Sequence, residues 1–168
     1  QTAEAHPDFA IIHSFPGAGP AMGPRLLAAL GTNRERFQSA SQMQCQSGIA
    51  PVLVSSGNQR WVHWRWACPK FVRQTFHEWA QHTMKKCQWA REFYQQKRAA
   101  AKSHHAAIRA LAFKWQRILY RCWKDRVLYD ESKYLSAKGS PPAEQPPQSR
   151  RVGIRWKSVA GFSKPSAF

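Results

Sequence analysis

A Ser-Ser-Gly-Asn segment at residues 55–58 contains the residue types that could carry out covalent chemistry on a nucleic acid. A serine attacks phosphorus only when its hydroxyl is exposed, its proton is removed and the phosphate charge is neutralised. A Ser-Gly turn provides exposure, and four cations follow closely in the sequence: Arg60, Arg65, Lys70 and Arg73. Ser, Gly and Asn also favour turns for backbone reasons alone, and no base or metal ligand is near. The local pattern by itself therefore favours an ordinary turn.

The stretch after this turn interleaves indole rings with basic side chains, as Trp61, Trp64 and Trp66 alternate with His63 and Arg65. Indoles can stack on unpaired bases while arginines follow the phosphate backbone. Equally, alternate residues of an extended segment can bury their Trp side chains and leave the basic ones outside. We expect a mixture of the two, with at least one Trp in the core. Residues 50–68 are predicted to be an ordered loop that can contain a short hairpin.

A Pro-Gly-Ala-Gly-Pro turn at residues 16–20 joins two predicted short helices, and it is typical of a helix-hairpin-helix over residues 7–31. In such a motif Gly17 and Gly19 would let the backbone approach a phosphate. The second helix would direct its unpaired N–H groups at the same phosphate. The alternative is a plain turn between two helices that serves only for packing. The pattern leaves both interpretations open.

Metal chemistry is not predicted for this chain. Two-metal nucleases and recombinases need several converging carboxylates, whereas the nine acidic residues here are scattered and mostly near Lys or Arg. The four cysteines are widely spaced and form no C-x-x-C pair, and His77-Glu78 lacks a second histidine at the offset of a zinc motif. The sequence therefore predicts no complete hydrolytic or recombinase site.

The charge balance predicts a polyanionic partner. Lys and Arg number 26 against nine Asp and Glu, for a formal net charge of +17. Such an excess favours nucleic acid, because each neutralised phosphate releases a condensed counterion. A membrane surface would need an amphipathic helix with separate basic and apolar faces, and here the basic residues are spread throughout. No apolar run approaches the roughly 20 residues of a membrane span, and we expect a reducing, cytoplasmic setting.

The periodicity predicts an all-α fold with long packed helices in the second half. A third short helix is expected from about Ser39 to Gln46, and apolar residues recur at helical spacing from Pro69 onward, with a break near 85–86. Ser103 is a predicted N-cap for another helix, whose apolar stripe is Ile108, Leu111, Trp115, Ile118 and Cys122. We expect a domain over residues 1–136, with its helical part at 69–135, and a disordered basic tail at 137–168.

The order of motifs over residues 8–135 resembles the C-terminal transposase domain of the insertion-sequence one-ten family, also called the one-sixteen/nine-oh-two family. Residues 11–20 are similar to the family's L-x-S-I-P-G-I-G-P segment, and Ser56-Gly57 falls on its S-G pair. The further matches follow in the same order: Leu30-Gly31, Arg36-Phe37, Ala40-Ser41-Gln42, Gly48-Ile49-Ala50-Pro51, residues 70–75, 107–112 and 117–120, and Tyr129-Asp130.

The resemblance implies a division of labour between two domains. An N-terminal domain with an RNase-H-like fold would supply a set of four carboxylates (DEDD) that binds divalent metal such as Mg²⁺. The domain seen here would supply the serine that forms a phosphoserine link to DNA, which makes Ser56 the candidate nucleophile and Ser55 the alternative. Oligomers of the enzyme and a structured guide RNA are the further partners implied. The sequence departs from the family at Trp61, Trp64 and Trp66, where relatives often carry more Lys, Arg and Gly.

Three functional hypotheses follow. The first is a transposase part that binds DNA and is inactive alone. We expect this chain to be the later portion, or a truncated copy, of a longer protein, so that the acidic domain is not part of it. The second is a non-catalytic module that holds DNA or RNA through the turn at 16–20 and the basic helices. The third makes residues 70–125 a scaffold for oligomerisation, because their apolar stripes could pack against a second copy.

Overall fold

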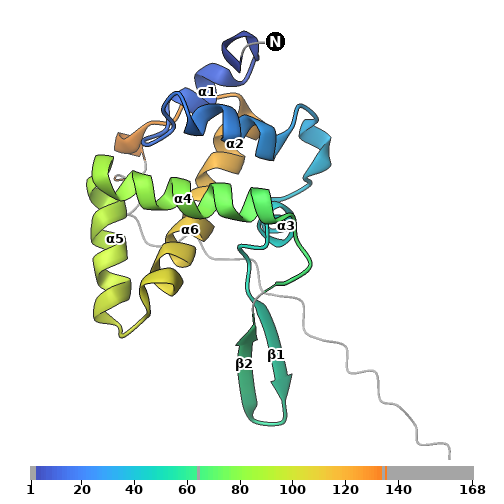
Figure 1. The fold of residues 1–168 in the computed structure, drawn as a ribbon, viewed down its shortest axis with the longest axis vertical. Helices are drawn as coiled ribbons and strands as arrows, with labels where there is room; N and C mark the ends of the chain where they lie inside the picture. The colour runs from blue at the N-terminus through green and yellow to red at the C-terminus, as the bar shows by residue number, and fades with distance from the viewer. Residues whose placement is uncertain (1–2, 64, 134, 136–168) are drawn as a thin grey trace, which may run out of the picture. The chain divides into compact units, whose positions relative to one another are not determined.

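The computed structural model describes residues 3–63, 65–133 and 135. The described part is mainly helical, with one two-stranded sheet (Figure 1). The elements are η1 (Ala3–Ala5), α1 (Phe9–His13), α2 (Met22–Leu30), η2 (Arg34–Arg36), α3 (Ala40–Gln46), β1 (Val52–Ser56), β2 (Gln59–His63), α4 (Lys70–Lys86), α5 (Gln88–Ala99) and α6 (His104–Asp125). They belong to one compact unit, residues 1–131. The predicted basic tail at 137–168 lies outside the described residues.

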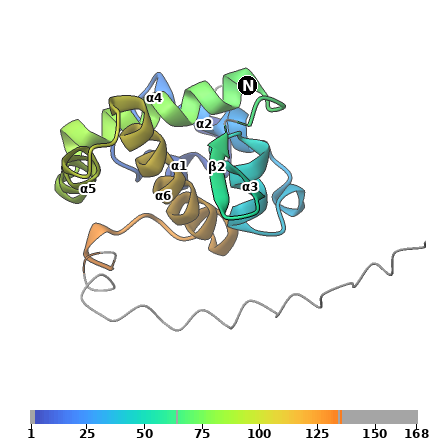
Figure 2. The ribbon, with the colours of Figure 1, turned by 90° about the horizontal axis from the view of Figure 1, so that it is seen from below.

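The core forms around α6, which packs against α1, α3, α4 and α5. Figures 1 and 2 both place α6 between α5 and α3. Its buried face recurs every three or four residues, as expected of a helix with an apolar stripe. The fully buried members of that stripe include Ile108, Leu111, Trp115, Leu119 and Trp123. Each contributes roughly 1.5–3 kcal/mol through burial of apolar surface, so α6 is the main support for every neighbouring element.

Buried indoles in this core also satisfy their N–H groups, as a ring in an apolar interior must. Trp115 Nε1 donates to Thr83 Oγ1 on α4 at 2.8 Å, and Trp79 Nε1 donates to the carbonyl of Pro16 at 3.0 Å. These bonds tie α4 to α6 and to the turn between α1 and α2. None of the described helices is long and apolar enough to span a bilayer.

The helix boundaries follow local signals in the sequence. Ser39 and Ser103 cap α3 and α6, with side-chain oxygens that accept from the N–H groups of Gln42 and Ala106. Gly31 adopts φ +75° and ends α2. The predicted break after residues 85–86 is present, because Cys87 has an extended backbone between α4 and α5. Each of these predictions is confirmed.

The hairpin anticipated as one possibility for residues 50–68 is present, so the fold is mainly rather than purely helical. β1 and β2 pair antiparallel with Ser56 opposite Gln59, and a two-residue turn connects them. Gly57 has φ +56°, the positive φ that a two-residue hairpin turn requires at its first central position. In Figure 1 the hairpin projects away from the helices.

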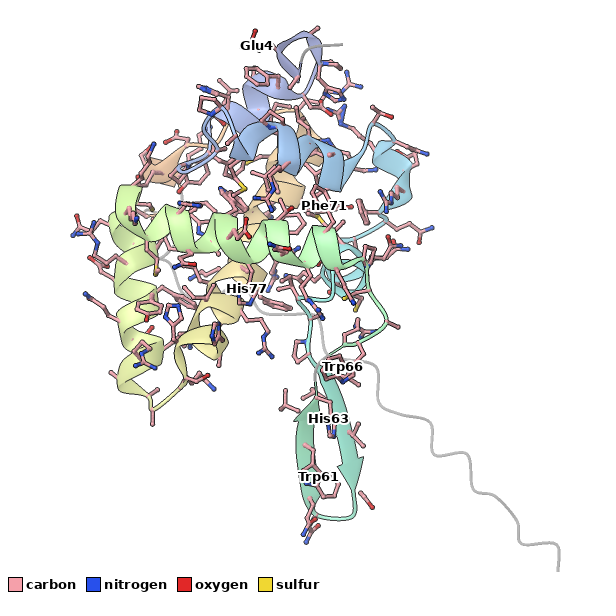
Figure 3. The ribbon with its side chains drawn as sticks, viewed as in Figure 1. Glu4, Trp61, His63, Trp66, Phe71 and His77 are labelled. Atoms are coloured by element: carbon pink, nitrogen blue, oxygen red, sulfur yellow. The ribbon has the colours of Figure 1, made fainter. Side chains whose placement is uncertain are left out.

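The aromatic side chains of this segment are not in the core where the structure describes them. Trp61 is 43% exposed and Trp66 is 81% exposed, while Trp64 lies outside the described residues. Figure 3 shows Trp61 on the hairpin and Trp66 at its base. The expectation that one Trp of this loop is buried is therefore not met by Trp61 or Trp66. A two-stranded ribbon has no second layer against which an indole could be buried.

Candidate nucleic-acid interface

Ser56 is exposed at the tip of the hairpin. It is the last residue of β1, and Gly57 follows in the turn with open space where a Cβ would project. Ser55 precedes it and pairs with Arg60. Because successive strand residues point to opposite faces, the two serines face in opposite directions. The exposure that the Ser-Gly pair predicted is therefore present at Ser56.

The cations that follow Ser56 in sequence do not gather around it. Arg65 and Arg73 lie at the base of the hairpin, where Arg65 Nη2 donates to Cys45 Sγ at 3.7 Å and Arg73 Nη1 donates to the Arg65 carbonyl at 3.4 Å. Lys70 is the first residue of α4. Four residue steps along β1 separate the tip from this base, about 13 Å at the rise of a strand. The expectation that Arg65, Lys70 and Arg73 surround the serine within this chain is corrected, because an antiparallel ribbon holds its tip and base apart.

Arg60 is the predicted cation nearest the tip, one residue pair away, and its backbone is part of β2. Its side chain lies outside the described parts of the structure. Of the other predicted cations, Arg65 and Arg73 lie at the hairpin base, and Lys70 begins α4.

A close contact at residues 48 and 68 pins the base of the hairpin segment. Gly48 has φ +72°, and a Cβ there would overlap the side chain of Cys68. Cys68 Sγ donates a hydrogen bond to the Arg65 carbonyl at 3.4 Å, and the same carbonyl accepts a second hydrogen bond from Arg73 Nη1. Just before Gly48, Ser47 Oγ accepts a 2.8 Å hydrogen bond from Gln116 of α6. The two ends of the hairpin segment are thus fixed to each other and to the helical core.

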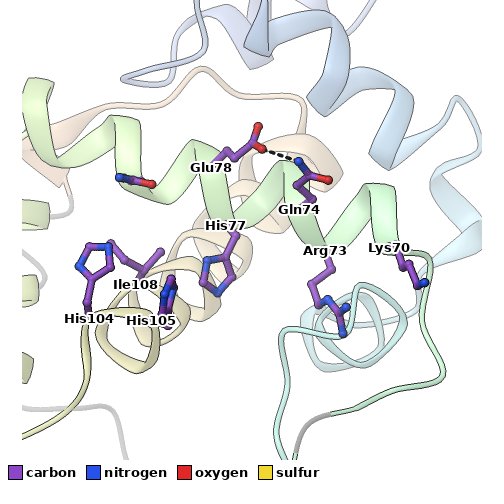
Figure 4. A pocket seen from close by; sticks show the side chains of 9 residues that line it. Lys70, Arg73, Gln74, His77, Glu78, His104, His105 and Ile108 are labelled. Atoms are coloured by element: carbon purple, nitrogen blue, oxygen red, sulfur yellow. Dashed lines mark hydrogen bonds between the residues drawn. The ribbon is translucent and has the colours of Figure 1, made fainter.

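A first groove, about 450 Å³, lies between α4 and the start of α6 (Figure 4). Most of its polar lining is basic or neutral, from Lys70, Arg73, Gln74, His77, Gln81, His104 and His105. The one acid in the lining, Glu78, accepts from Gln74 at 2.7 Å and forms an ion pair with Arg25. These partners, Gln74 first and then Arg25, lower the pKa of Glu78, so it is ionised and its charge is compensated.

His77 is the neutral member of this groove. Burial, followed by the charges of Arg109, His105, Arg73 and His104, lowers its pKa from 6.5 to about 4. The pKa of Arg109 is also lowered, mainly by burial and then by the charge of Arg73. At neutral pH His77 is therefore uncharged, while Lys70 and Arg73 give the groove positive charge. A bound anion would relieve the repulsion between the two arginines.

A second groove, about 530 Å³, lies between the hairpin base and helices α5 and α6. Apolar side chains from Pro51, Val62 and Phe93 form part of it, and its charged lining is entirely basic: Lys102, Arg109, Lys114 and Arg117. Lys114 Nζ also lies 4.7 Å from the ring centre of Phe93. Arg109 lines this second groove, and its charge also lowers the pKa of His77 in the first groove.

Sequence reasoning missed the cations of α6, although a signal was present. Residues 106, 109, 110, 113, 114 and 117 recur at the i, i+3, i+4 spacing of one helix face. Three of those six positions, Arg109, Lys114 and Arg117, are basic. A search for periodic charge would therefore have found the second groove, whereas the search for short-range charge after Ser56 did not.

The turn at residues 16–20 has a partner inside the protein. Gly17 has φ +79°, and a Cβ there would lie 3.3 Å from both the Cβ of His82 and the backbone N of Thr83. The carbonyl of Pro16 accepts from Trp79, also on α4. Gly19, by contrast, faces open space. The packing interpretation thus describes Gly17, whereas Gly19 has open space beside it where a ligand could approach.

Within the described ranges, no group of three or more His, Cys, Asp or Glu side chains could hold a metal ion. The carboxylate of Asp8, the most buried acid, is held by Trp123 and Arg34. These residues do not fit the divalent metal that the resemblance implies.

A strongly basic chain with cationic grooves on its surface is typical of proteins that bind nucleic acids. The sequence matches the transposase IS116/IS110/IS902 family over residues 9–95. The chain belongs to this family of insertion-sequence transposases.

Three curated relatives are similar to this chain. The mini-circle putative transposase for IS117 of Streptomyces coelicolor is 31% identical over 128 residues, 76% of this chain and 31% of the relative. The insertion element IS116 44.8 kDa protein of Streptomyces clavuligerus is 28% identical, over 71% of this chain and 30% of the relative. The insertion element IS900 42 kDa protein of Mycobacterium paratuberculosis is 29% identical, over 76% and 32%. The chain thus spans about a third of the length of these relatives.

Proposed function

We propose that this chain is the DNA-binding part of an insertion-sequence transposase and that Ser56 is its nucleophile. The observation that carries the proposal is the position of Ser56, exposed at the tip of a ribbon whose base is flanked by two cationic grooves. The grooves would hold the phosphate backbone, through Lys70 and Arg73 on one side and the cations of α6 on the other. The ribbon would then bring the serine to the strand.

In the proposed reaction the Ser56 Oγ forms a bond to phosphorus while one phosphate–sugar ester bond breaks. The serine proton passes to the departing sugar oxygen, and the product is a phosphoserine link between protein and DNA. The described residues place neither a base nor enough charge at the tip of the hairpin to complete this step. A carboxylate-rich domain elsewhere in a longer protein is the proposed source of both, and this chain alone would bind DNA without cleaving it.

A structured guide RNA and further copies of the protein are proposed partners, on the strength of the family resemblance. The cationic grooves suit either nucleic acid, because they offer charge to a phosphate backbone. The second candidate function, a non-catalytic nucleic-acid-binding module, is favoured by the distance of about 13 Å between the hairpin tip and the cations at its base.

Two measurements test the proposal. First, affinity of the chain for labelled DNA should fall steeply with salt, and replacing Lys114 and Arg117 by Ala should reduce both the affinity and the salt slope. An affinity that is independent of salt contradicts the binding role. Second, covalent protein–DNA adducts should be measured in a full-length form that includes the acidic domain. Ser56→Ala should abolish them without loss of binding, while Ser55→Ala, the matched control, should retain them. Adducts that survive Ser56→Ala would show that the assignment is wrong.

A further inference from the structure

The register of the hairpin places an indole on the same face as Ser56. Val54 pairs with Trp61 and Ser56 pairs with Gln59. Directly paired residues share a face, and so do residues two apart along a strand. Val54, Ser56, Gln59 and Trp61 therefore form one face, which we call the serine face. Ser55, paired with Arg60, belongs to the opposite face, together with the pair of Leu53 and Val62.

The serine face exposes apolar surface beside its hydroxyl. Val54 and Trp61 are each 43% exposed. Val54 lies about 7 Å from Ser56 along β1, and Trp61 is the diagonal neighbour of Ser56 on β2, about 7–8 Å away. Figure 3 shows Trp61 on the ribbon, toward its tip. The opposite face has a different neighbour, because Val62 lines the second groove with residues of α5 and α6. Among the described residues, the serine face thus presents an exposed aromatic surface next to the candidate nucleophile.

We propose that Trp61 stacks on an unpaired base next to the phosphate that Ser56 contacts. The inference rests on the proposed function and adds that the strand is single-stranded or locally opened at the hairpin. An indole offers a flat π face to any base, and such stacking needs a base that is not already covered by its neighbours. Trp61 is thereby a positioning residue, which holds the nucleotide while Ser56 meets the phosphate.

Charge complementarity selects a nucleic acid as the occupant of this face. The charged lining of the second groove is entirely basic at the hairpin base, so a strand bound there is attracted to the protein before it reaches the tip. A second copy of this chain would bring the same formal charge of +17 against this face, which disfavours the serine face as the place where copies of the protein meet. A duplex in its normal stacked form presents base edges and covers the base faces on which an indole stacks.

The test compares three variants of this chain by fluorescence anisotropy with labelled single-stranded DNA, single-stranded RNA and duplex DNA of one sequence. Trp61→Ile removes the π face but keeps a β-branched partner for Val54, so the ribbon is retained. Trp61→Phe keeps a smaller π face. Leu53→Ala is the matched control, since Leu53 is 74% exposed on the opposite face. An NMR spectrum of each variant verifies that β1 and β2 still pair.

We expect Trp61→Ile to weaken single-strand binding by about 5- to 150-fold, the range found for loss of one stacked base. Trp61→Phe should retain most of the affinity, Leu53→Ala should retain all of it, and duplex binding should change least. The slope of affinity against salt should be the same in wild type and Trp61→Ile, because no cation has been removed. A loss of affinity for single-stranded DNA or for single-stranded RNA supports the inference. The nucleic acid that shows the larger loss is the one that Trp61 binds.

The inference is overturned if Trp61→Ile and wild type bind single strands equally, or if Leu53→Ala causes the same loss. It is also overturned if Trp61→Ile dissociates an oligomer without changing affinity, which would make the serine face an interface between copies. A failure of the proposed function would look different: the wild-type chain itself would bind nucleic acid weakly and without dependence on salt.

Discussion

The indole Nε1 of Trp123 donates a 2.9 Å hydrogen bond to a carboxylate oxygen of Asp8, 115 residues earlier in the chain. The other carboxylate oxygen of Asp8 is paired with Arg34, whose Nε donates to the carbonyl of Trp123 at 3.0 Å. Asp8 is 3% exposed. This closed set of contacts joins the end of α6 to the segments that precede α1 and form η2, so one of the few acids of the chain has a structural role.

We expect Asp8→Ala to destabilise the protein by about 1–3 kcal/mol, because the buried N–H of Trp123 and the partly buried guanidinium of Arg34 both lose their carboxylate acceptor. The free energy of unfolding in urea, followed by tryptophan fluorescence, measures the effect. Asp125→Ala is the control at the exposed end of α6, and it should change stability by no more than about 0.5 kcal/mol. Equal stability of the two variants would contradict the role of Asp8.

Gly17→Ala should destabilise the protein by at least about 1–2 kcal/mol, because φ is +79° there and the new Cβ would meet α4 at 3.3 Å. Gly19→Ala, in open space, should leave the unfolding midpoint nearly unchanged. Thermal unfolding of both variants checks the difference. If Gly19→Ala instead weakens DNA binding while stability is intact, the turn does contact phosphate, as in a helix-hairpin-helix.

Gly48→Ala should loosen the base of the hairpin, because its Cβ would overlap Cys68. The change is expected to cost about 1–3 kcal/mol and to speed tryptic cleavage after Arg65. Gly57→Ala is the matched control, with a positive φ at the tip but open space around it. Its strain of about 1–2 kcal/mol is local to the turn, so cleavage after Arg65 should stay slow. Unchanged proteolysis of Gly48→Ala would show that the contact does not anchor the hairpin.

The stability of the protein should fall as pH decreases through the range set by His77. Its pKa is about 4 in the folded protein against 6.5 for an ordinary histidine, because of burial and then of Arg109. Between these values the unfolded chain binds a proton that the folded protein does not, so the stability present above about pH 6.5 is lost toward pH 4.

His77→Gln, which cannot titrate, should flatten the dependence of the unfolding midpoint on pH between 7 and 4. The measurement is thermal unfolding at several pH values. The control for the substitution itself is His13→Gln, at an exposed position of α1. A steep fall that persists in His77→Gln would assign the acid sensitivity to other groups.

Several features of the fold could be predicted because they depend on neighbouring residues. Ser39 and Ser103 supply oxygen to the first free N–H groups of their helices, and Gly31 adopts the positive φ that ends α2. The Ser-Gly turn at 56–57 was visible for the same reason, since backbone conformation there depends on the absence of a Cβ. The family could be recognised because its motifs follow one another in order.

Charge, helix ends and an exposed Ser-Gly turn were thus readable from the chain alone, because each follows from residue type and from neighbours a few positions away. Packing of distant apolar faces decided the rest. It placed Gly17 against α4, and it moved Arg65 and Arg73 to the hairpin base and away from Ser56. It also brought the cations of α6 beside the base of the hairpin. Distances between residues far apart in sequence depend on how helices and strands bury their surfaces together, and no local pattern contains that information.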